Sequence, residues 1–186
     1  FDENWGFECM WNPMQDLLSG RATQLFEYNL AYSIPLYLHV NENSDNENML
    51  QFWWYASLAR HLGIGGLSNR DSVKYIALKE AMTLYKKIKT ILTRGIFYGI
   101  SQNIHLHVDE INKLGVITAY NLSSRIQITG VQFDPIKFGL NVSSVEIYNG
   151  TNQKISSIKL TLSSNNLYQF RVEIPPLSPI IAILKK

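Results

Sequence analysis

The chain has 186 residues, of which 46% are hydrophobic and 17% charged, and its formal net charge is +2. This length holds one domain or two small ones, and the composition is that of a globular protein, not a disordered or fibrous one. The small net charge argues against a nucleic-acid partner, and no hydrophobic run reaches the ~18 residues that a membrane-spanning helix needs. The sequence therefore predicts neither nucleic acid nor membrane as a partner.

The first hundred residues alternate between short hydrophobic segments and segments with helical periodicity. The expected strands lie at 7–11, 34–40 and 62–67. The expected helices lie at about 16–31, 47–61 and 72–93. This alternation predicts parallel βαβ units. Three parallel strands alone would leave both sheet edges open, so the segment is expected to be the last part of a larger α/β assembly, such as a (β/α)8 barrel.

The composition changes after the helix expected at 72–93, which runs into Gly95. Every Trp and Met lies before residue 100, and the remainder is rich in Ile, Val, Ser, Thr and Asn. Short alternating blocks predict strands at 104–108, 114–120, 124–128, 145–148, 155–162, 167–174 and 180–184. Turn signals such as Asn149-Gly150 separate them, which predicts a β-sandwich of about seven or eight strands. The expected domains are therefore 1–99 and 100–186.

The junction between these two parts resembles that of a known enzyme family. Tyr85-Lys86-Lys87-Ile88-Lys89, followed by Gly95-Ile96-Phe97-Tyr98-Gly99, is similar to the end of the catalytic barrel in alpha-galactosidase-type glycoside hydrolases. There, the last barrel helix is followed by an exit into a C-terminal β-sandwich. The resemblance implies an α/β part followed by an all-β part: the last strands and helices of a (β/α)8 barrel, with strands six to eight at 7–11, 34–40 and 62–67, plus a C-terminal antiparallel β-sandwich.

The resemblance also implies a catalytic residue. The general acid/base of the family lies after strand six, in a Ser-Asp-Asp-like loop that an Arg follows. In this chain Asp16 and Arg21 take those places, although Met14 and Gln15 stand where Ser and Asp are expected. Retaining hydrolysis needs two carboxylates ~5–5.5 Å apart. The family's nucleophile comes from strand four, which this chain lacks, so the chain is expected to need the remainder of the barrel and to be inactive alone.

Further candidates lie where catalysis in such a barrel takes place, at the carboxyl ends of the strands. Trp11 ends the first strand and suits sugar stacking, and His39, Asn41 and Asp45 surround the end of the second. Structural alternatives stay open: Asp16 also suits a helix N-cap, Asp45 a solvated helix start, and His39 a hydrogen-bonded core position. No cofactor or metal is expected.

Three further features have alternative interpretations. His105 and His107 alternate on one strand, but no third ligand is spaced to complete a metal site. The pair Trp53-Trp54 is expected in the core, because an exposed stacking platform is rarer. Three Asn-x-Ser/Thr triplets, at Asn121, Asn141 and Asn149, are glycan acceptors or chance products of the composition.

The leading interpretation is the C-terminal part of a retaining glycoside hydrolase that acts on alpha-linked sugars, with carbohydrate as substrate. The rival is a non-catalytic carbohydrate-binding or structural remnant of such a barrel, and a third reading is a barrel that has lost its activity. The sequence leaves sugar specificity and compartment open.

Overall fold

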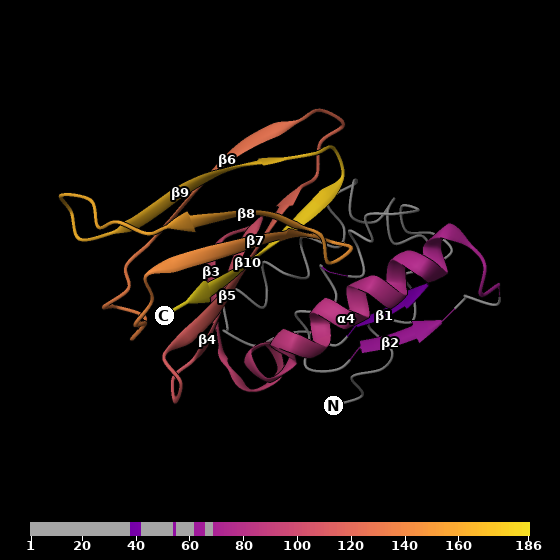
Figure 1. The fold of residues 1–186 in the computed structure, drawn as a ribbon, viewed down its shortest axis with the longest axis horizontal. Coiled ribbons are helices and arrows are strands. Elements are labelled where there is room, and N and C mark those ends of the chain that lie inside the picture. The colour runs from indigo at the N-terminus through magenta and orange to yellow at the C-terminus, as the bar shows by residue number, and fades with distance from the viewer. Residues whose placement is uncertain (1–37, 42–53, 55–61, 66–68) are drawn as a thin grey trace.

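The computed structural model describes residues 38–41, 54, 62–65 and 69–186 (Figure 1). The first described strands are β1 (Leu38–Asn41) and β2 (Leu62–Gly65), and helix α4 (Val73–Arg94) follows them. The remaining strands are β3 (Ile96–Ser101), β4 (Ile104–Asp109), β5 (Leu114–Asn121), β6 (Gln127–Phe133), β7 (Ser144–Asn149), β8 (Lys154–Lys159), β9 (Tyr168–Ile174) and β10 (Ser178–Lys185). Among the described residues, no helix is both long and hydrophobic enough to cross a lipid bilayer.

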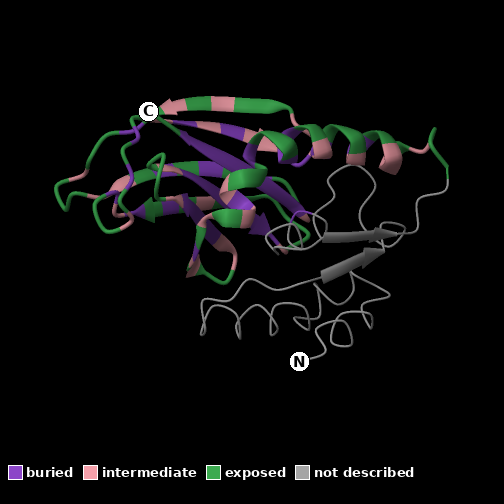
Figure 2. Ribbon diagram, turned by 90° about the horizontal axis from the view of Figure 1, so that it is seen from below, coloured by how far each residue is buried: buried purple, intermediate pink, exposed green. Residues whose placement is uncertain are grey.

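The strands after α4 form an antiparallel β-sandwich. One sheet has six strands in the order β3-β4-β5-β10-β7-β8, and the other pairs β6 with β9. Every neighbouring pair in both sheets is antiparallel. The core between the sheets is aliphatic and aromatic, and the small sheet contributes Val131, Phe133, Phe170, Val172 and Ile174 to it. Figure 2 shows that buried positions are concentrated in the strands of the sandwich.

The central strands of the large sheet are buried on both faces. In β4, the four residues from His105 to Val108 are buried, and in β5 every residue after Leu114 is buried. Continuous burial along an antiparallel strand requires a second layer on the outer face, because alternate side chains point to opposite faces. Helix α4 supplies part of that layer, since it packs against β4 and β5.

Local sequence sets the ends of α4. Ser72 is the N-cap, and its hydroxyl accepts a hydrogen bond from the Tyr75 N–H at 3.2 Å. Gly95 is the C-cap with an extended backbone. A Cβ on Gly95 would lie 2.3 Å from the Ile91 carbonyl oxygen and 2.7 Å from that of Val108, so only glycine fits there. The same glycine that predicts the end of the helix therefore also allows the end of α4 to lie close to the backbone of β4.

Strands β1 and β2 form a separate parallel pair, with Leu38 opposite Leu62 and Asn41 opposite Gly65. Parallel strands need a crossover connection, here residues 42–61. The parallel pairing expected for these two segments is confirmed. The expected strand at 7–11 and helix at 16–31 lie outside the described residues, as does the helix expected at 47–61 except for Trp54. The barrel itself therefore stays a prediction.

Two details of the predicted sandwich need correction. The strand expected at 124–128 begins instead at Gln127, because the Asn121 side chain holds 122–125 in a turn: its Oδ1 accepts the Ser123 N–H at 2.8 Å. The segment after Gly95 was expected to be a connection that leads from the barrel into the sandwich. It is instead strand β3, which pairs with β4. The expected boundary at 99/100 would cut this strand, and the division into two domains stays a prediction.

Candidate functional site

The expected site lies at the carboxyl ends of the parallel strands. Asn41 and Gly65 are the last residues of β1 and β2 and lie opposite one another, and His39 lies opposite Gly63. Parallel strands end at one edge of their sheet, so β1 and β2 deliver the segments that follow them to the same edge. Trp11, Asp16, Arg21 and Asp45 lie outside the described residues. Their roles, like those of His39 and Asn41, therefore stay predictions.

The described part of the chain shows how this parallel pair is joined to the sandwich. The outer face of the large sheet carries a buried layer, here called the junction layer: Phe97, His105, His107, Val116, Thr118, Tyr120, Ile181 and Ile183. Opposite it, α4 buries a stripe of residues: Ala77, Ala81, Leu84, Tyr85, Ile88 and Leu92. The face of the sandwich at the junction layer is therefore occupied and closed to a glycan.

Trp54 is the described residue of the β1–β2 connection, and it is fully buried. Its indole Nε1–H donates a hydrogen bond to the Gly150 carbonyl at 2.6 Å. Its own carbonyl accepts a hydrogen bond from the Tyr120 hydroxyl at 3.0 Å. The expected burial of Trp54 is confirmed. No local pattern predicts its partners, because they lie 66 and 96 residues further along the chain.

The two strand histidines belong to the junction layer. Their rings pack against Phe97, at centroid distances of 5.5 Å for His105 and 5.1 Å for His107. The His105 Nε2 lies 2.9 Å from the Gln102 carbonyl oxygen, which can only accept, so Nε2 carries the proton in the neutral ring. Burial lowers the pKa of His105 from 6.5 to about 4, against a smaller opposing effect of that hydrogen bond. Among the described residues, no three His, Cys, Asp or Glu side chains group as metal ligands.

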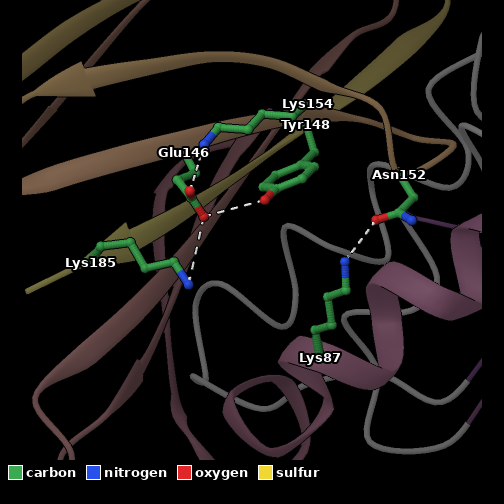
Figure 3. Close-up of polar contacts among 6 residues, drawn as sticks. All are labelled: Lys87, Glu146, Tyr148, Asn152, Lys154 and Lys185. Carbon is green, nitrogen blue, oxygen red and sulfur yellow. Dashed lines mark hydrogen bonds and ion pairs between the residues drawn. The ribbon is translucent and has the colours of Figure 1, made fainter.

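Polar contacts border the junction layer on the side of β7 and β8 (Figure 3). Lys87 of α4 donates to the Asn152 side-chain oxygen at 3.3 Å, and its Nζ lies 6.0 Å from the Tyr148 ring centroid. Glu146 accepts a hydrogen bond from Lys154 at 2.6 Å, and its other oxygen lies 3.6 Å from the Lys185 Nζ. The bond from Lys154 is the main cause that lowers the pKa of Glu146. These contacts make this border a partly exposed polar network with two ion pairs.

The three possible glycan acceptors differ in their surroundings. Asn121 is fully buried, and its Nδ2 donates to the carbonyls of Arg125, Ile174 and Pro175 at 2.7–2.9 Å. The Nδ2 of Asn149 donates to the Gln153 side chain at 2.9 Å. Asn141 is exposed. Asn121 is thus a structural residue that fastens the end of β5 to the end of β9.

Neither a family model nor a curated protein matches the chain. Solved structures do share its fold. A cyclomaltodextrin glucanotransferase with a three-domain ABC distribution matches over 92% of this chain and 42% of its own, with a TM-score of 0.54 and 12% identity. The alpha-galactosidase I of Mortierella vinacea matches over 76% of this chain and 36% of its own (TM-score 0.49, 10% identity). A GH27 β-L-arabinopyranosidase of Geobacillus stearothermophilus matches over 69% of this chain and 27% of its own (TM-score 0.43, 13% identity).

Alpha-galactosidases and related glycoside hydrolases are thus among the similar structures, as the junction motif implies. At these identities the likeness concerns the fold alone. The chain spans between 27% and 42% of the length of the solved structures that it resembles.

Proposed function

We propose that this chain forms the end of the catalytic barrel and the C-terminal β-sandwich of a retaining glycoside hydrolase that acts on alpha-linked sugars. One observation carries the proposal: a parallel strand pair is followed by a helix that contains the junction motif's Tyr85-Lys86-Lys87 stretch, and then by an antiparallel sandwich. Its fold is shared with a glucanotransferase at a TM-score of 0.54. The nucleophile would come from another part of the complete enzyme.

In this proposal Asp16 is the general acid/base. It protonates the leaving glycosidic oxygen as the anomeric bond breaks, and it then removes a proton from the water that hydrolyses the glycosyl-enzyme. Trp11 stacks on a sugar ring, while Arg21, His39, Asn41 and Asp45 donate or accept hydrogen bonds to its hydroxyls and to the catalytic carboxyl. The sandwich is structural, which agrees with the occupied face at the junction layer.

The test is Asp16→Asn in the complete enzyme, assayed on alpha-linked galactosides. We expect cleavage of an alkyl galactoside to slow by at least ~10²-fold, because a positioned general acid contributes that much. A substrate with a good leaving group should lose less in the glycosylation step, and azide should restore turnover by replacing the activated water.

The matched control is Asp134→Asn, in a turn of the sandwich. The Asp134 Oδ1 accepts the N–H groups of Ile136 and Lys137, and asparagine keeps that oxygen. This variant should retain full activity. Full activity of Asp16→Asn would refute its assignment and direct the same test to Asp45. No hydrolysis of any alpha-glycoside by the unaltered complete protein would favour the rival, a non-catalytic remnant.

A further inference from the structure

The two hydrogen bonds of Trp54 reach opposite sides of one strand. Tyr120 lies near the end of β5 and Gly150 directly follows β7, and these strands flank β10. Tyr120 is paired with Pro179 and Asn149 with Ile180, so both partners of Trp54 lie level with the beginning of β10. The sandwich thus holds Trp54 at two points that are separated by the width of a strand.

The two bonds use different groups of Trp54. One fixes the indole ring and the other fixes the backbone carbonyl, so together they restrain both the position and the orientation of the residue. Both hydrogen bonds are buried. Removing the partner of a buried polar group costs more stability than removing the partner of a group exposed to water. Tyr120 also touches the ring of His105 at a centroid distance of 5.6 Å, which fixes the hydroxyl that reaches Trp54.

We propose that the β-sandwich anchors the β1–β2 connection through Trp54, and that Tyr120 is a positioning residue for the edge at Asn41. The connection begins directly after Asn41 and ends directly before Leu62, and Trp54 lies within it. Loss of this anchor is therefore expected to loosen both parallel strands. The anchor itself stands on the hydrogen bonds, whereas its effect on hydrolysis rests on the proposed function. In this proposal the sandwich acts on the site through Trp54.

The experiment compares two Tyr→Phe substitutions in the 186-residue chain. Tyr120→Phe removes the hydroxyl that donates to the Trp54 carbonyl, and Tyr168→Phe removes one that donates to the Val142 carbonyl within the sandwich at 2.9 Å. Backbone hydrogen exchange is then followed in β1 and β2. Because one hydrogen bond is lost, we expect Tyr120→Phe to accelerate exchange there by about threefold to tenfold. Tyr168→Phe should leave those amides unchanged.

Equal exchange of β1 and β2 in the two variants would overturn the anchor. If Tyr120→Phe fails to fold, Trp54→Phe replaces it, since it removes the indole donor and keeps an aromatic ring, and the same comparison decides. In the complete enzyme, Tyr120→Phe should lower kcat by several-fold with KM nearly unchanged, while Tyr168→Phe alters neither. Unchanged kcat with accelerated exchange would overturn the positioning role, and inactivity of the unaltered enzyme would refute the proposed function while the exchange result stands.

Discussion

At the scale of single residues, buried polar side chains hold this fold at specific points. The two Nδ2 hydrogens of Asn121 are donated to three carbonyls from two separate segments, one hydrogen being shared, and its Oδ1 accepts from the Ser123 N–H and hydroxyl. Only an amide supplies donors and an acceptor together in this shape. Replacing it with a carboxylate would keep the acceptor and place a negative charge against three carbonyl oxygens.

Asn121→Asp is therefore expected to lower the free energy of unfolding by about 3–5 kcal/mol at neutral pH, the range for an uncompensated buried charge. Urea unfolding followed by circular dichroism measures it. Asn141→Asp is the control, because Asn141 is exposed, and its effect should stay within about 0.5 kcal/mol. Equal losses in the two variants would show that the three bonds of Asn121 contribute nothing specific.

His105 makes stability depend on pH. Its pKa is lowered to about 4 in the folded chain from an ordinary value of 6.5, because the charged ring would be buried. As the pH falls below 6.5, His105 takes up a proton in the unfolded chain before it does so in the folded chain. The contribution of the neutral ring to the free energy of unfolding is therefore complete above pH 6.5. It is lost as the pH falls toward 4, by up to about 3 kcal/mol.

The measurement is urea unfolding of the chain and of His105→Gln between pH 7.5 and 4.5. The stability of the unaltered chain should fall more steeply than that of the variant, because glutamine does not titrate. Parallel curves would contradict this assignment and would locate the acid sensitivity elsewhere.

At the scale of elements, α4 converts one face of the sandwich into an interior. Leu84 is fully buried in α4, whereas Val73 at the start of the helix is 57% exposed. Leu84→Ala should lower the free energy of unfolding by about 2–5 kcal/mol, because it removes buried contacts and leaves a cavity. Val73→Ala, the control, should change it by no more than about 0.5 kcal/mol. Thermal or urea unfolding measures both, and similar small effects would mean that this stripe of α4 is not buried in solution.

The elements also show which features were predictable from sequence. The helix with its Ser72 start and Gly95 end, and most sandwich strands, follow from periodicity and turn residues, which are local signals. The predicted start of β6 was wrong, because the Asn121 side chain at the end of β5 holds the residues before Gln127 in a turn. Strand β3 was missed because Gly95-Ile96-Phe97-Tyr98-Gly99 was interpreted as an exit, although its pairing with β4 continues the sheet.

The site was predictable only in part. The backbone position of Asn41 at the end of a parallel strand follows from the strand pattern. The bonds of Trp54 to Tyr120 and Gly150 depend on the packing of distant segments, and no local spacing encodes them. The assignments of Asp16, Trp11, Arg21 and Asp45 rest on a family resemblance and stay predictions.

At the scale of the whole molecule, we propose that a structural sandwich supports the edge where a catalytic barrel ends. The junction layer, α4 and Trp54 join the two parts through buried contacts, so they are expected to behave as one unit. A flexible carbohydrate-binding module would instead leave this sheet face free for its ligand.

The most direct test of this account is the anomeric configuration of the first product. The complete enzyme of the proposed function is mixed with 4-nitrophenyl alpha-galactoside, and proton NMR follows the released sugar before mutarotation. Retention through two displacements predicts that alpha-galactose forms first, and that the 186-residue chain alone releases none. Initial formation of beta-galactose, or release by the chain alone, would contradict the account.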